Sequence, residues 1–130
     1  MKIVFPAIVL FTDNLPACSS GCANGPIIRI KPSHKDDKGI QAHELVHVRQ
    51  WWRTFGFHSG LYLTRRCYRL HSEVEAYRKQ LEYPHPLYTR DQLIDMYATW
   101  LSLPEPEGYD CHEICTKERA IELLGAGAAG

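Results

Sequence analysis

The residues best suited to chemistry are His43, Glu44 and His47, which form the pattern His-Glu-Leu-Val-His. On an α-helix, residues four apart lie on one face, so both imidazoles can reach a single ion at about 2.0–2.1 Å. Glu44 adjoins the first histidine and projects beside the ion and not onto it. With 7 histidines in 130 residues, the pattern arises by chance about 0.03 times. These residues predict a metal site on a helix.

The chemistry expected of such a site is hydrolysis. A zinc ion lowers the pKa of the water it holds toward about 7, and Glu44 would remove a proton from that water as it attacks a carbonyl. Zinc hydrolases usually take three protein ligands and leave a fourth position open. The best source of a third ligand is the segment Glu73-Val74-Glu75-Ala76-Tyr77, on the second long helix expected.

At this point the sequence resembles the gluzincin or minigluzincin-like branch of the zincins, the H-E-x-x-H zinc metallopeptidases. In that branch a glutamate on a following helix completes the site, commonly as E-x-x-A, where the small residue lets two helices approach. The resemblance covers about a quarter of the chain, residues 43–77. It implies one catalytic Zn²⁺ held by His43, His47 and Glu73, with Ala76 at the close approach.

Other third ligands stay open. Glu75 lies two residues from Glu73 and would point elsewhere on the helix, and His58 or His71 could replace a glutamate. The metzincin branch is excluded, because Gln50 stands where its glycine belongs and Arg53 where its third histidine belongs.

The sequence also departs from the gluzincin pattern. Where thermolysin-like enzymes often carry an aspartate that orients a ligating histidine, this chain has Tyr77, which supplies no carboxylate. A hydrolase of this type needs a donor for the developing oxyanion. Tyr68, His71 and Tyr77 are candidates, and the sequence does not choose among them.

The leading hypothesis is therefore a zinc metallopeptidase acting on a peptide or protein substrate, with Glu44 as general base. The alternative is a non-catalytic structural or binding module that retains a zinc-containing core. A third hypothesis is a metal-dependent hydrolase of a non-peptide amide. Substrate and oligomeric state are left open.

The expected elements are two strands, at residues 3–11 and 26–31, followed by four helices, at residues 40–55, 61–83, 90–103 and 111–124. Their order predicts a compact, mainly helical α+β domain with a small N-terminal sheet. We expect a single zincin-like domain over residues 1–130. It divides into a β-rich part (1–38), two active-site helices (39–83), C-terminal helices (84–124) and a flexible tail (125–130).

Composition excludes some partners. The net charge is zero, whereas binding to nucleic acid needs a clear basic excess. We interpret the run Arg65, Arg66, Arg69 as a solvated helix edge. No segment reaches the length of apolar sequence that a membrane span needs. The apolar run Ile3–Phe11 is interpreted as a strand and not a signal peptide, which favours a cytoplasmic over a secreted location.

Five cysteines include two pairs with i, i+4 spacing, Cys18/Cys22 and Cys111/Cys115. Cross-disulfides between the pairs, free thiols and a second zinc site are all compatible with this spacing.

Two further interpretations concern packing and substrate. The aromatic residues Trp51, Trp52, Phe55 and Phe57 are expected to pack between the first two helices. The resemblance to zincins, and not the residue pattern, implies that strand 26–31 is an edge strand that binds the substrate backbone.

Overall fold

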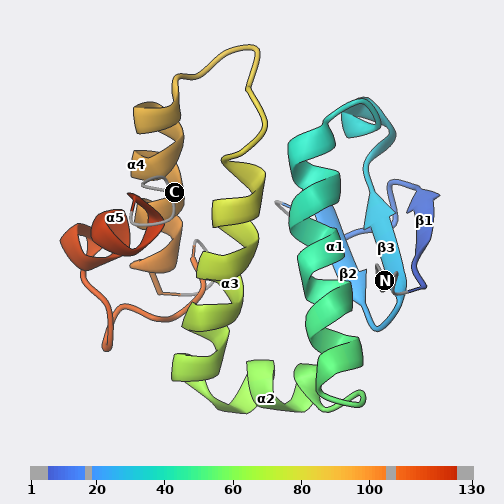
Figure 1. The fold of residues 1–130 in the computed structure, drawn as a ribbon, viewed down its shortest axis with the longest axis horizontal. Coiled ribbons are helices and arrows are strands. Elements are labelled where there is room, and N and C mark those ends of the chain that lie inside the picture. Colours follow the sequence, from blue (N-terminus) through green and yellow to red (C-terminus); the bar gives the residue numbers. More distant parts are fainter. Residues whose placement is uncertain (1–5, 17–18, 105–107, 126–130) are drawn as a thin grey trace, which may run out of the picture.

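The computed structural model describes residues 6–16, 19–104 and 108–125. Within these residues the chain forms a three-stranded sheet and five α-helices, which confirms the α+β class (Figure 1). The strands are β1 (Ile8–Phe11), β2 (Gly21–Asn24) and β3 (Ile27–Ile30), followed by a short 3-10 helix, η1 (Pro32–His34). The helices are α1 (Lys38–Arg53), α2 (His58–Thr64), α3 (Arg66–Gln80), α4 (Arg90–Leu101) and α5 (Lys117–Gly125).

The sheet has the order β1-β3-β2, with β1 parallel and β2 antiparallel to β3. β2 was not among the predicted strands, and its sequence Gly21-Cys22-Ala23-Asn24 contains no β-branched or aromatic residue. Pairing with β3 overrides that weak local preference. Gly25, in the turn between β2 and β3, has a φ of 59° and faces the ring of Trp51, so it fits a residue without a Cβ. The first strand is shorter than predicted, and residues 3–5 lie outside the described chain.

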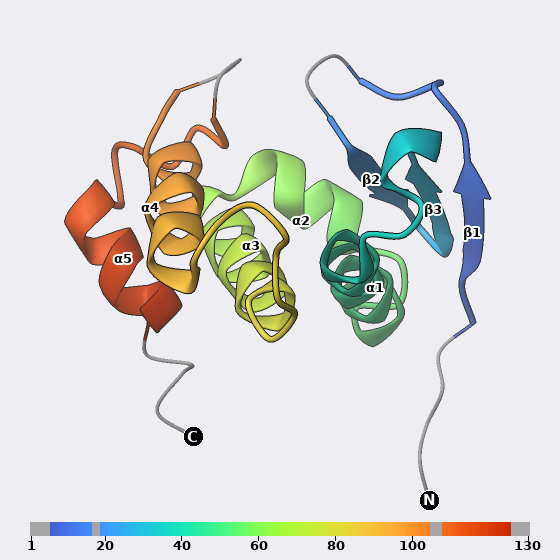
Figure 2. The same cartoon turned by 90° about the horizontal axis from the view of Figure 1, so that it is seen from above.

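The predicted role of strand 26–31 as an edge strand is wrong. β3 is central and is hydrogen-bonded on both sides, so its backbone is not free to pair with another chain. Among the described strands, β2 is the one with an unpaired edge beside the helices; it packs against α1 and is the strand nearest to α3 (Figure 2).

Helix α1 begins where Asp37 caps it, accepting a hydrogen bond from the backbone of Ile40 at 3.1 Å. Val48, which is fully buried, packs against Ile28 and Ile30 of β3. This apolar contact fixes the rotation of α1 on the sheet. The histidines at 43 and 47 then turn toward α3.

The predicted helix over residues 61–83 is two helices. Arg65 has an extended backbone (φ −124°, ψ 107°), which separates α2 from α3 and lets α2 run across the end of the α1–α3 pair (Figure 1). Arg69 is buried and not on a solvated edge, which corrects the interpretation of the arginine run. Its guanidinium donates to the carbonyls of Tyr62, Leu63 and Tyr109 at 2.9–3.0 Å.

The C-terminal helices complete a second core. α4 begins with a capping box formed by Thr89 and Gln92. The last helix begins at Lys117 and not at the predicted Cys111. Asp110 has a φ of 59° and residues 111–115 form a turn, after which Thr116 accepts a hydrogen bond from the backbone of Arg119. Apolar side chains of α3, α4 and α5 form one buried cluster that is separate from the cluster between α1 and the sheet.

The aromatic prediction is wrong for Phe55 and Phe57, whose side chains are 92% and 73% exposed. Trp52 packs beside the sheet cluster, and Trp51 covers Gly25 and Gly56. The indoles therefore pack on the sheet side of α1 and not between the first two helices, so the prediction is wrong for them as well. Among the described residues, no helix is long and apolar enough to cross a membrane.

Within the described chain, Cys22, Cys67, Cys111 and Cys115 are free thiols. A disulfide between Cys22 and either member of the second pair is therefore not formed. Cys18 lies outside the described residues. No cluster of three or more metal-ligating groups in the described ranges includes a cysteine, so the predicted second zinc site finds no support there.

Candidate metal centre

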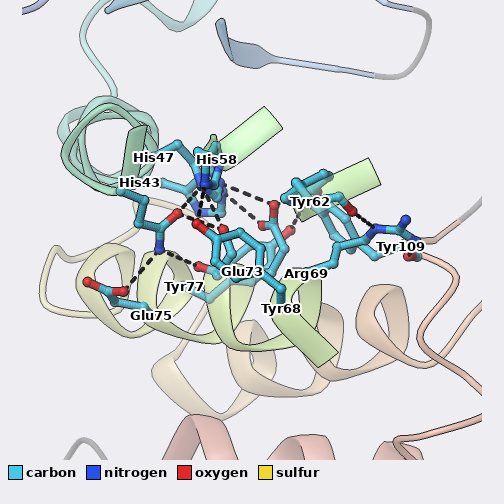
Figure 3. Close-up of polar contacts among 12 residues, drawn as sticks. His43, His47, His58, Tyr62, Tyr68, Arg69, Glu73, Glu75, Tyr77 and Tyr109 are labelled. Atoms are coloured by element: carbon cyan, nitrogen blue, oxygen red, sulfur yellow. Dashed lines mark hydrogen bonds and ion pairs between the residues drawn. The ribbon is translucent and has the colours of Figure 1, made fainter. Parts of the chain in front are cut away.

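The structure brings together His43 and His47 of α1 with Glu73 of α3 (Figure 3). The Nε2 atoms of the two histidines lie 3.2 Å apart. Glu73 Oε2 is 3.3 Å from His43 Nε2, and Glu73 Oε1 is 3.2 Å from His47 Nε2. All three residues are buried.

These distances match what one zinc ion requires. With bonds of about 2.0–2.1 Å and tetrahedral angles, neighbouring ligand atoms lie about 3.3 Å apart. The donor set of two imidazoles and one carboxylate is one that zinc prefers. In addition, Glu73 Oε2 is buried and makes no hydrogen bond to any described residue. The three residues therefore fit a metal ion.

Within this cluster, the carboxylate and the imidazoles strongly shift one another's pKa values. Burial alone would raise the pKa of Glu73, but the adjacent imidazoles outweigh burial and hold that pKa far below its usual range. Burial alone would lower the pKa of His47, but the charge of Glu73 outweighs it and raises the pKa to about 9. In the absence of metal, this pair is thus a buried ion pair at neutral pH.

Glu44 lies beside this cluster and outside the ligand set. The pKa of Glu44 is raised, mainly by burial. The nearby histidines lower this pKa in part, and the negative charge of Glu73 raises it further. Its carboxylate packs on β2, because a Cβ at Gly21 would stand 3.3 Å from Glu44 Oε1. Glu44 makes no hydrogen bond to a described side chain, unlike Glu73. A carboxylate with these surroundings is available to accept a proton.

Sequence reasoning missed three residues that contact the ligands. Tyr62 of α2 donates a hydrogen bond to Glu73 Oε1 at 2.7 Å. Gln50 Oε1 lies 2.9 Å from His47 Nδ1, and Ser72 Oγ lies 3.2 Å from the same atom. Gln50 was within reach of sequence reasoning, because it follows His47 by three residues and so shares its helix face. Tyr62 and Ser72 carry no such signal.

The alternative third ligands lie elsewhere. Glu75 points to the other side of α3, where it accepts hydrogen bonds from Gln50 and Arg53. His71 is exposed. His58 is buried near His47 but is not among the clustered ligand atoms, and its Nδ1 lies 2.7 Å from the hydroxyl of Tyr68. Burial and the positive charge of His47 lower the pKa of His58 to about 4.

Two of the oxyanion candidates are engaged in other contacts. Tyr77 places its ring 4.5 Å from that of His43, edge to face, while its hydroxyl lies 2.7 Å from the hydroxyl of Tyr109. Tyr68 contacts His58. Tyr77 therefore does not replace the missing aspartate as a hydrogen-bond partner, and His43 Nδ1 is buried without a partner among the described residues.

Comparison with known proteins returned no match to a family model, to a curated protein or to a solved structure.

Proposed function

We propose that this chain is a zinc-dependent metallopeptidase in which His43, His47 and Glu73 hold the ion and Glu44 is the general base. The observation that carries the proposal is the 3.2–3.3 Å spacing among the buried Nε2 atoms of His43 and His47 and the two carboxylate oxygens of Glu73, on two different helices. A buried carboxylate and two buried imidazoles cost stability unless they are paired or bind a metal. Pairing within the cluster leaves the buried Glu73 Oε2 without a hydrogen bond from any described residue, which supports a metal-binding role.

The ion and Glu44 would have different roles in the reaction. Zinc, when bound, would polarise the substrate carbonyl and acidify a water molecule. Glu44 accepts a proton as water adds to the carbonyl carbon, and it passes that proton to the nitrogen as the carbon–nitrogen bond breaks. The products are a carboxylic acid and an amine, and Glu44 is returned to its starting state. Burial of the site excludes bulk water from this proton transfer.

The position of β2 supports a peptide as the substrate. Gly21 begins this strand and directly adjoins Glu44. One edge of β2 is paired with β3, and the other pairs with no strand among the described residues. An extended peptide that added to this second edge would run beside Glu44, with main-chain hydrogen bonds holding it in register.

The test combines metal analysis with proteolysis. Zinc per chain is measured by elemental analysis for the unmodified protein and for Glu73→Gln, with Glu118→Gln on the exposed face of α5 as the matched control. We expect about one zinc per chain, lost in Glu73→Gln only. Cleavage of a mixed peptide library is then followed by mass spectrometry. Glu44→Gln should keep the zinc and lose at least about 100-fold in rate. Absence of zinc after reconstitution would refute the proposal.

One observation favours the second candidate, a non-catalytic zinc module. His43, Glu44, His47 and Glu73 are each less than a tenth exposed, as in zinc sites that only stabilise a fold. In that case Glu44→Gln would leave both the zinc content and the thermal stability unchanged, and no peptide would be cleaved.

A further inference from the structure

The amide of Gln50 has only one orientation that satisfies its neighbours. One end of the amide lies 3.2 Å from the backbone oxygen of Ser72 and 3.0 Å from the carboxylate of Glu75. Both of these groups only accept hydrogen bonds, so the NH₂ group of Gln50 must face them. Its carbonyl oxygen then faces His47 and the Ser72 hydroxyl, which donates to it at 2.6 Å.

This orientation requires hydrogen on Nδ1 of His47, and in the neutral ring that binds a metal it leaves Nε2 without one. The Gln50 carbonyl oxygen accepts only, so His47 must donate to it from Nδ1, over 2.9 Å. The Ser72 hydroxyl has given its own hydrogen to Gln50 and offers a lone pair to the same Nδ1–H at 3.2 Å. His47 Nε2, which faces Glu73, is thereby left as the metal-binding atom.

We propose that Gln50 is a positioning residue that holds His47 in the Nδ1–H form, with Nε2 directed at the metal, and that Glu75 in turn fixes Gln50. The inference rests on the proposed function for its metal, but the hydrogen bond itself exists without one. Gln50 and Ser72 are both buried, and both line a cavity that also borders Arg53 and Glu75. This arrangement takes the place of the carboxylate that orients ligating histidines in many zinc sites.

His43 provides the contrast within the same site. Its Nδ1 is buried and has no hydrogen-bond partner among the described residues. Orientation of the two ligating imidazoles therefore depends mainly on the partners of His47. The hydrogen-bonded chain His47–Gln50–Glu75–Arg53 reaches the surface at its last two members. The Arg53–Glu75 ion pair is about half exposed and borders this cavity, which has a volume of about 200 Å³. Arg53 is consequently the replaceable member of the network, and Gln50 is the essential one.

The first test is zinc affinity, measured by competition with a chromophoric chelator. Gln50→Leu keeps the bulk and removes both polar ends, and we expect it to bind zinc about 10–100-fold more weakly. Gln41→Leu is the matched control, because Gln41 lies on the same helix and donates only to the backbone of Lys35. It should bind zinc like the unmodified protein. Equal affinity of Gln50→Leu and Gln41→Leu would overturn the inference.

A charge exchange separates positioning from packing. The double substitution Gln50→Glu with Glu75→Gln moves the carboxylate to His47 and the amide to the outside, at unchanged net charge. An anionic acceptor strengthens a ligating histidine, so zinc affinity should equal or exceed that of the unmodified protein. If Gln50 acted through packing alone, Gln50→Leu, which keeps the bulk, would bind zinc like the unmodified protein. A double variant that binds zinc as weakly as Gln50→Leu would show that an acceptor at position 50 does not support His47, and the proposal would be wrong.

Nuclear magnetic resonance tests the hydrogen bond independently of zinc. The His47 Nδ1–H proton should give a slowly exchanging, downfield signal in the zinc-free and in the zinc-loaded protein, and Gln50→Leu should lose it. If the unmodified protein takes up no zinc yet shows this signal, the proposed function fails while the assigned hydrogen bond stands. If zinc binds and the signal is absent, the function survives and the role of Gln50 is refuted.

Discussion

Glu73 is the residue on which the site depends most heavily. One of its carboxylate oxygens contacts His43 and the other contacts His47. The oxygen near His47 also accepts a hydrogen bond from the Tyr62 hydroxyl at 2.7 Å. A hydrogen bond to an ionised group is about twice as strong as one between neutral groups. Tyr62 is therefore more than a packing residue, since it restrains the carboxylate from the side of α2.

Replacing Tyr62 by phenylalanine should show this restraint. Tyr62→Phe removes one hydroxyl and leaves the ring in place, so we expect the free energy of unfolding to fall by about 1.5–3 kcal/mol in the zinc-free protein. Urea denaturation followed by circular dichroism measures the change. Tyr83→Phe, on a more exposed ring, serves as the control and should change stability by less than about 0.5 kcal/mol. A similarly small effect of Tyr62→Phe would show that the hydroxyl does not restrain Glu73.

At this scale the sequence predicts the groups that lie on one helix and misses those that meet across helices. The face shared by His43 and His47 follows from helical spacing alone. The convergence of Glu73 with that face was expected only through resemblance to a family. Tyr62 and Ser72 were not predicted, because their contacts depend on how closely α2 and α3 approach α1. The distance between helices cannot be inferred from a local sequence pattern.

At the scale of elements, the break between α2 and α3 positions the wall of the site. A continuous helix over residues 61–83 would carry Tyr62 away from Glu73. The extended backbone at Arg65 instead turns α2 across the end of α1 and α3. Arg69 holds this turn, because its guanidinium satisfies two carbonyls near the end of α2 and the carbonyl of Tyr109.

Arg69→Met should therefore destabilise the fold strongly. The change leaves three carbonyls without their donor, and we expect a loss of about 3 kcal/mol or more in the free energy of unfolding. Arg69→Lys should restore little, since an ammonium lacks the planar fork that reaches three acceptors. Arg65→Met, at an exposed position of the same run, is the control. Equal urea midpoints for the Arg65 and Arg69 variants would contradict the assigned role.

The helix break also explains why element boundaries were predicted unevenly. The caps of α1 and α4 are local and were close to the predicted starts, with Asp37 and Thr89 as the capping residues. No glycine or proline lies at Arg65 to indicate that the helix is interrupted there. It is stabilised by Arg69, whose burial contradicts the usual expectation for an arginine in a basic run. β2 was missed for a related reason, since its pairing with β3 and not its composition makes it a strand.

At the scale of the whole molecule, the proposed metal site lies between two separately packed cores. His43 and His47 belong to the helix that packs on the sheet, and Glu73 belongs to the helix that packs with α4 and α5. An ion held by all three would act as a cross-link between the two halves. At free zinc about a thousand-fold above the dissociation constant, the stabilisation is about 4 kcal/mol, which corresponds to a rise on the order of 10 °C in Tm.

The size of that rise should depend on pH, because His47 and Glu73 pair with each other when zinc is absent. The pKa of Glu73 is lowered by folding, so its contribution exists above its unfolded pKa of about 4.3 and is lost as the pH falls further. The pKa of His47 is raised to about 9, so its contribution is complete below about 6.5 and is lost as the pH rises through about 9. The contribution of this pair to the stability of the chelated protein should thus be greatest between about pH 5 and 6.5.

Zinc binding follows the opposite trend, since only the neutral imidazole binds the ion. Between pH 6.5 and 9 the zinc-free protein loses the ion pair while competition from protons for His47 declines. The difference in Tm between zinc-loaded and chelated protein should therefore widen across this range, as measured by calorimetry at several pH values. In His47→Gln the chelated protein should lose the decline above pH 6.5, and zinc should have little effect at any pH. A difference in Tm that stays constant or narrows with rising pH in the unmodified protein would show that His47 is not a ligand that must release a proton.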